Sequence, residues 1–120
     1  MTTAIPPLLI KRIADAKPYQ APNHFDMRGL RLQGFEPGGP ERFWVGLSHF
    51  LPGGGAGPDA SPLEKVYVVL NGRLTVQVGD AVSELGPLDS CTIGANIVRH
   101  IINASNEIAT MIVIMPYAPS

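Results

Sequence analysis

Apolar and polar residues alternate in many short segments of the chain, which is the pattern of half-buried β-strands. The alternation is clearest at 43–51, where the residues expected on the inner face are Phe43, Val45, Leu47, His49 and Leu51. Further strands are expected at 28–35, 65–70, 73–78, 81–85, 90–93, 97–102 and 109–115. Turn residues separate these segments and no helical stretch interrupts them. The pattern therefore predicts an all-β fold, an antiparallel sandwich or barrel.

Glycine and proline mark the expected turns between these strands. Asn71-Gly72 is a preferred pair for a two-residue hairpin, so it is expected to join 65–70 to 73–78. Gly79-Asp80 is expected to make the next turn. Pro52 precedes three glycines and is expected to end the strand before it.

The chain divides into an N-terminal arm, 1–27, and one barrel domain, 28–120. Prolines at 6, 7, 18 and 22 forbid a long helix in the arm. A net charge of −1 without a basic stripe argues against nucleic acid as a partner. No apolar run reaches the ~18 residues of a membrane span. The start lacks the pattern of a signal peptide, so a cytoplasmic location is expected.

Two spaced motifs suggest a family. Residues Gly53, Asp59, Ser61, Lys65 and Gly72 keep the spacing of the first conserved motif of the cupin superfamily, and the text from Tyr67 to Gly72 is also similar to it. The segment 85–103 resembles the second motif, and anchoring it on Asp89 and Asn103 puts Arg99 at the metal-binding histidine. A register anchored on Gly86 would put Ile97 there instead. The resemblance covers 43–116 and implies a small antiparallel barrel, the jelly-roll or double-stranded β-helix.

The resemblance also implies a divalent metal ion, held by three histidines and one glutamate. Asp59, Ser61, Lys65 and Arg99 stand at those positions here. Two of the four are cations, which would repel a divalent ion by several kcal/mol at about 4 Å. The sequence therefore predicts a site without metal, and it suggests no other cofactor. The alternative is a metal held by His24, His49 and Asp59.

The candidate site residues follow from strand alternation. If Lys65 faces inward, Tyr67 does too; if Arg99 faces inward, Ile97 and Ile101 do too. The candidate catalytic residues are Lys65, Arg99, Tyr67 and His49. The candidate substrate-binding residues are Asp59, Ser61, Glu64, Ile97 and Ile101.

These residue types favour proton transfer on a small anionic or enolisable molecule. A lysine in an apolar cavity beside Arg99 is partly neutral, so Lys65 could act as a base or form a Schiff base. Arg99 could hold a carboxylate or an enolate oxygen. Dehydration, decarboxylation and isomerisation without metal all fit.

Two other functions stay open. The cavity could bind a small acid without turnover, or Lys65 and Arg99 could be neutralised by Asp59 and Glu64 in a vestigial barrel. Small cupins form homodimers, which the resemblance implies here. Trp44, Phe50 and Val68 are expected to form an outward apolar surface that a second copy would cover.

Overall fold

A computed structural model describes residues 6–35 and 38–119. Within these ranges the chain is built from β-strands and a single 3-10 turn, so the predicted all-β fold is confirmed. The elements are η1 (Ile13–Asp15), β1 (Lys17–Tyr19), β2 (His24–Gln33), β3 (Phe43–Asp59), β4 (Lys65–Asn71), β5 (Leu74–Val78), β6 (Ala81–Leu85), β7 (Ser90–Ile93), β8 (Arg99–Ile102) and β9 (Ala109–Pro116).

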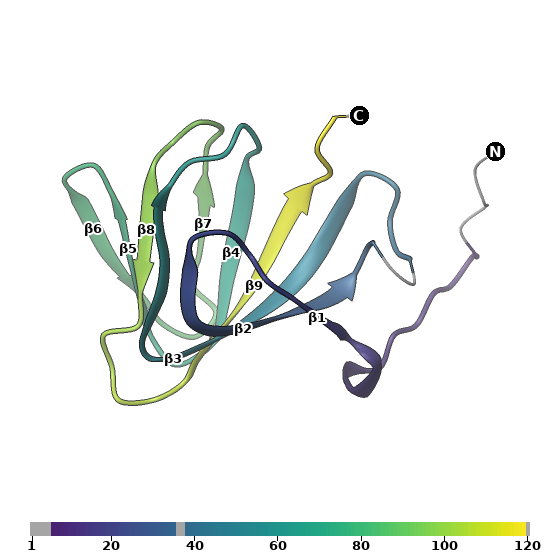
Figure 1. The fold of residues 1–120 in the computed structure, drawn as a ribbon, viewed down its shortest axis with the longest axis horizontal. Helices are drawn as coiled ribbons and strands as arrows, with labels where there is room; N and C mark the ends of the chain where they lie inside the picture. Colours follow the sequence, from purple (N-terminus) through teal and green to yellow (C-terminus); the bar gives the residue numbers. More distant parts are fainter. Residues whose placement is uncertain (1–5, 36–37, 120) are drawn as a thin grey trace.

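The strands form one antiparallel sheet that curls into a nearly closed barrel (Figure 1). Their order is β6-β5-β8-β3-β9-β4-β7, with β2 paired to β3 and β1 paired to β2. The long strand β3 connects the two walls, because its first half pairs with β9 and its second half with β8.

The strand β3 does not end at Pro52 as expected, because it continues to Asp59. The glycines after Pro52 allow neighbouring strands to approach closely. A Cβ atom on Gly55 would lie 2.2 Å from the carbonyl oxygen of Ile101 on β8. Glycine, which has no side chain, thus lets the backbone of β3 pass close to β8 where the barrel curves.

One of the two expected hairpins is present. Val78 pairs with Ala81, so Gly79-Asp80 is a two-residue turn between β5 and β6. The expected hairpin at Asn71-Gly72 is wrong, because β4 pairs with β7 and β9 whereas β5 pairs with β6 and β8. Asn71-Gly72 instead lies where the chain crosses from one wall of the barrel to the other.

The prediction of which face of β3 points inward is also wrong. Phe50 is fully buried in the core and Trp44 packs against it, whereas Leu47 and His49 point out of the barrel. Of the expected outward set, only Val68 faces outward. Alternation could not decide the facing because the outer surface of this sheet is apolar as well. Its central row runs across four strands through Leu30, Leu47, Ile112 and Val68.

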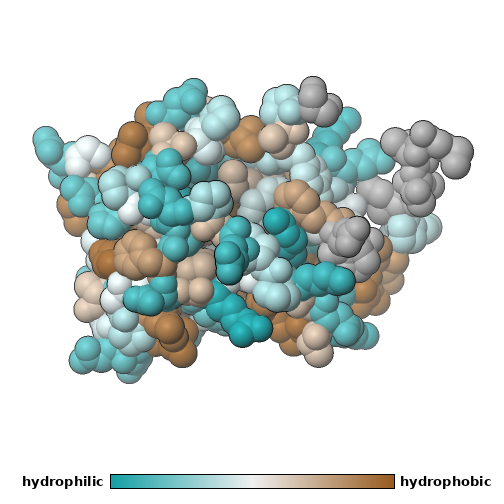
Figure 2. Space-filling view, viewed as in Figure 1, coloured by the Kyte–Doolittle hydropathy of each residue, from teal (hydrophilic) through white to brown (hydrophobic). Residues whose placement is uncertain are grey.

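The segment before β1 extends away from the barrel (Figure 1). Its apolar side chains Leu8, Ile10 and Ile13 are exposed, and Figure 2 shows apolar residues gathered at this end of the molecule. The sheet already includes residues before position 28, because β1 and the start of β2 pair within it. In the described ranges, no helix is long and apolar enough to cross a membrane.

Candidate functional site

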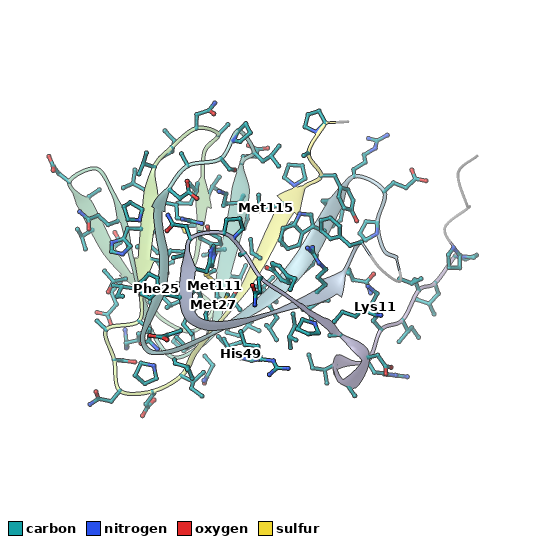
Figure 3. The ribbon with its side chains drawn as sticks, in the orientation of Figure 1. Lys11, Phe25, Met27, His49, Met111 and Met115 are labelled. Atoms are coloured by element: carbon teal, nitrogen blue, oxygen red, sulfur yellow. The ribbon has the colours of Figure 1, made fainter. Side chains whose placement is uncertain are left out.

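A cavity of about 310 Å³ opens at one end of the barrel. Side chains of β1, β2, β3, β4, β8 and β9 line it, together with the segment between β1 and β2. Met111 and Met115 of β9 form part of its apolar wall (Figure 3). Its chemically active lining residues are His24, Arg31, Asp59, Ser61, Lys65, Tyr67 and Arg99.

Lys65 lies at the start of β4 and is only 5% exposed. Its Nζ donates a hydrogen bond to Oγ of Ser61 at 3.3 Å. Burial lowers the pKa of Lys65, and the charge of Arg99 lowers it further, while Asp59 acts in the opposite direction. Lys65 therefore carries a larger neutral fraction than an exposed lysine, as a base or nucleophile requires.

Arg99 lies at the start of β8 and is 7% exposed. Its Nε donates to the hydroxyl oxygen of Tyr67 at 2.9 Å, and its Nη1 is buried without a hydrogen-bond partner. Burial raises the pKa of Tyr67, while the charge of Arg99 and its hydrogen bond lower it. The guanidinium and the hydroxyl together form a donor pair suited to an anionic oxygen.

The described residues do not neutralise Lys65 and Arg99 by ion pairing. The ion pair found among them is Arg73–Glu84, on the surface. Asp59 lines the mouth of the cavity, but its Oδ1 accepts from the backbone nitrogen of Ala60. The vestigial alternative required Asp59 and Glu64 to pair with the two cations, and neither does so.

Four of the candidate residues lie outside the cavity lining. His49 points out of the barrel (Figure 3), where its Nδ1 is hydrogen-bonded to Oγ1 of Thr110 at 2.9 Å. Glu64 is exposed and borders an outer groove, because it alternates with Lys65. Ile97 precedes β8 and is 41% exposed, and Ile101 is fully buried in the core instead of the lining.

The residues at the metal positions do not fit a divalent ion. Asp59 and Ser61 offer oxygens, but Lys65 and Arg99 bring positive charge to the same cavity. The part of the chain that the structure describes contains no cluster of three or more His, Cys, Asp or Glu side chains that could hold a metal. The alternative set is not assembled either, because His49 is on the outer face while His24 and Asp59 line the cavity.

His24 is a site residue whose role the sequence left open. Its Nδ1 donates to the carbonyl oxygen of Pro22 at 2.7 Å, so the neutral ring has its lone pair on Nε2. Burial lowers the pKa of His24; the Pro22 bond and the charge of Asp59 oppose this, whereas Arg99 and Lys65 lower it further. A neutral imidazole with a free Nε2 can accept a proton.

Arg31 and an aromatic group at the other end of the cavity were not foreseen. The guanidinium carbon of Arg31 lies 3.6 Å from the ring centre of Phe35, 4.3 Å from that of Tyr19 and 5.4 Å from that of Trp44. The segment 28–35 alternates only loosely, so no sequence pattern marked Arg31 as inward. Pairing of β2 with β3 brings these residues together.

Comparison with known proteins identifies the family. The model of the family described as "Cupin domain" matches residues 46–115, more than half of the chain. A Mycobacterium tuberculosis protein named beta-D-galactosidase Rv1717 is 44% identical over 104 residues, which are 87% of this chain and 90% of that protein.

Solved structures with the same fold include the polyketide cyclase RemF from Streptomyces resistomycificus, with a TM-score of 0.77 and 21% identity over 90% of this chain and 80% of that one. An RmlC-like cupin from Shewanella frigidimarina has a TM-score of 0.75 and 14% identity, covering 92% of both chains. The sequence match, the barrel topology and the spacing of the lining residues agree, and the chain belongs to the cupin family.

Proposed function

We propose that this protein acts on a small anionic, sugar-like molecule by moving a proton next to a carbonyl group, without a metal ion. The observation that carries the proposal is the excess positive charge in the cavity. Arg31, Lys65 and Arg99 line it, whereas Asp59 is the one carboxylate among the described lining residues. An anionic substrate would supply the missing negative charge.

The residues around Lys65 support proton abstraction. A neutral Lys65 Nζ would take a proton from the carbon beside the carbonyl. The electron pair of that C–H bond would move to the carbonyl oxygen, where Arg99 and the Tyr67 hydroxyl would stabilise the enolate. In an isomerisation the resulting ammonium would return the proton to the carbonyl carbon, while the proton of the neighbouring hydroxyl would move to the former carbonyl oxygen, so that the carbonyl group changes place. In a dehydration the ammonium would give the proton to a departing hydroxyl, which leaves as water.

His24 supports the same chemistry with a second proton site. Its Nε2 lone pair is free, since Nδ1 is committed to Pro22. Two bases whose pKa values are both lowered could deprotonate one carbon and reprotonate another.

The relative from Mycobacterium tuberculosis supports a carbohydrate substrate, since it is 44% identical and is named a beta-D-galactosidase. Hydrolysis of a galactoside is therefore the second candidate function. Glycoside hydrolases commonly use two carboxyl groups about 5–10 Å apart. The described lining provides Asp59 alone, so we favour an acidic sugar over a neutral galactoside. Simple capture of such an acid, without turnover, is the non-catalytic alternative.

The test uses galacturonate, which carries both a carboxylate and a carbonyl group. Chelator-treated protein would be incubated with it in D2O, and NMR would follow deuterium entering the carbon beside the carbonyl. We expect exchange with the native chain, loss with Lys65→Met, and no loss with the matched control Lys17→Met on the exposed strand β1.

Three other results would change the assignment. Binding without exchange would support the capture alternative. Release of nitrophenol from 4-nitrophenyl β-D-galactoside, with no exchange on galacturonate, would favour the hydrolase. Exchange that persists in Lys65→Met would refute the role of Lys65.

A further inference from the structure

We propose that the ligand carries two anionic groups, one bound at the Lys65–Arg99 end of the cavity and one bound by Arg31 at the aromatic end. The inference rests on the proposed function, because it refines the class of acid that this cavity accepts. It makes Arg31 a residue that determines specificity.

The strand register connects the two ends of the cavity by one row of residues that pair across neighbouring strands. Arg31 pairs with Gly46, Gly46 with Val113, and Val113 with Tyr67. The ends of this row are therefore three strand spacings apart, or about 14 Å between backbones at ~4.8 Å per spacing. Both ends line the same cavity, and their side chains reach inward from opposite sides.

The middle of the row is kept small. A Cβ atom on Gly46 would lie 2.8 Å from Cζ3 of Trp44 and 3.0 Å from the hydroxyl oxygen of Tyr19. Glycine lets these two aromatic side chains lie over the strand beside Arg31, and Val113, the next residue of the row, adds apolar lining toward Tyr67. The cavity thus has positive charge at both ends and apolar surface between them.

The environment of Arg31 leaves its charge available. The rings of Phe35 and Tyr19 contact the guanidinium at 3.6 and 4.3 Å. Such contacts use the face of the guanidinium and leave its N–H edge for acceptors. Nη1 is buried without a hydrogen-bond partner, and no carboxylate in the described residues pairs with Arg31. A buried donor without an acceptor is costly, so an anionic oxygen fits here.

Lys11 adds to the positive charge at this end. Its Nζ donates to the carbonyl oxygen of Gly34 at 3.4 Å. Burial lowers the pKa of Lys11, and the nearby charge of Arg31 lowers it further. A single anionic group at the Lys65–Arg99 end would leave Arg31 without a counter-charge among the described residues. A ligand with an acidic group at each end would neutralise both ends of the cavity.

The experiment compares three acids by isothermal titration calorimetry with the full chain in low salt. Galactonate carries one carboxylate, galactarate carries a carboxylate at each end, and 6-phosphogluconate carries a carboxylate and a phosphate. We expect both dianions to bind at least about tenfold more tightly than galactonate. A preference for one dianion would identify the second group as carboxylate or phosphate.

Variants assign that preference to Arg31. In Arg31→Met the dianions should lose their advantage and bind no better than galactonate binds to the same variant. Arg28→Met removes an arginine from the same strand on its exposed side and should keep the preference. If Arg31→Met fails to fold, Arg31→Lys is used in its place. Lysine keeps the charge but lacks the planar N–H donors of the guanidinium, so the preference for dianions should shrink without disappearing.

The outcomes separate this inference from the proposed function. Equal affinity for galactonate and both dianions in the native chain overturns the inference alone, as does an unchanged preference in Arg31→Met. Failure of every acid to bind overturns the proposed function and the inference with it.

Discussion

Arg99 donates from Nε to the hydroxyl oxygen of Tyr67 at 2.9 Å, inside the barrel. Because an arginine can only donate, the Tyr67 oxygen accepts this bond and keeps its own proton for another partner. Burial, the larger influence, raises the pKa of Tyr67 and keeps the hydroxyl protonated at neutral pH. The pair therefore presents a phenol proton and a guanidinium to the same cavity.

Tyr67→Phe is predicted to weaken binding of galacturonate about tenfold, because one hydrogen bond to the ligand is lost. It should also lower stability by about 1–3 kcal/mol, since Nε of Arg99 loses its buried partner. Calorimetry and thermal melts would measure both. Tyr117→Phe is the matched control, because the Tyr117 hydroxyl accepts from the backbone of Phe35 and does not line the cavity. Unchanged binding in Tyr67→Phe would contradict the prediction.

Lys65→Met is predicted to stabilise the protein while abolishing proton exchange. The folded-state pKa of Lys65 lies below that of the unfolded chain, chiefly because of burial, so folding disfavours its charged form. Removing the charge should add about 1 kcal/mol at pH 7, or about 4 °C in melting temperature.

The gain should shrink as the pH rises from the folded-state pKa through 10.5, because only above 10.5 does the native lysine become mainly neutral in the unfolded chain as well. Thermal melts at pH 7 and pH 10 would test this, with Lys17→Met as the control. A variant that melts below the native chain at pH 7 would contradict the argument.

The lowered pKa of His24 predicts that the protein becomes less stable at acidic pH. Its folded-state pKa is lowered from 6.5, mainly by burial, so the unfolded chain binds the proton more readily. Stability from this group is complete above pH 6.5 and falls as the pH drops toward the folded-state pKa. Urea unfolding between pH 5 and 8 should show this fall, and His24→Gln should reduce it.

The strands from 65 onward could be predicted because each is a short apolar or alternating segment bounded by turn residues. The grouping of Lys65, Tyr67 and Arg99 could be predicted too, since motif spacing places Lys65 and Arg99 and alternation carries Tyr67 to the same side. These inferences needed only local sequence and one family resemblance.

The facing of β3 could not be predicted, because Leu47 and Phe50 are both buried although they lie on opposite faces of the sheet. The cluster around Arg31 was missed for a different reason. Tyr19, Phe35 and Trp44 come from separate segments, and only the pairing of β1 with β2 and of β2 with β3 brings them together. Local periodicity carries no information on such pairings.

The apolar outer face predicts a homodimer. The outer row through Leu47, Val68 and Ile112 is apolar, Val68 and Ile112 are partly exposed on it, and Leu8 and Ile10 of the N-terminal segment are exposed. A second copy would cover such a surface. Ile112→Glu should convert a dimer to a monomer in light scattering after gel filtration, while Val82→Glu, at an exposed position on β6, should not. A native chain that is monomeric at high micromolar concentration would contradict this.

Asn103 is predicted to be the polar residue on which barrel stability depends most. It is fully buried just after β8; its Nδ2 donates to the carbonyl oxygens of Phe50 and Glu107 at 3.0 and 2.7 Å. Its Oδ1 accepts from the backbone nitrogen and Oγ of Ser105 at 3.0 and 2.7 Å, so every hydrogen-bonding position of the amide is used.

Asn103→Ala would leave several of these buried partners unsatisfied and should cost about 2–4 kcal/mol in urea unfolding. Asn103→Asp should also be destabilising, because a carboxylate cannot donate to the two carbonyl groups. Asn106→Ala, at an exposed position in the same turn, is the control and should stay within about 0.5 kcal/mol of the native chain. A loss below about 1 kcal/mol in Asn103→Ala would show that the turn between β8 and β9 holds without this amide.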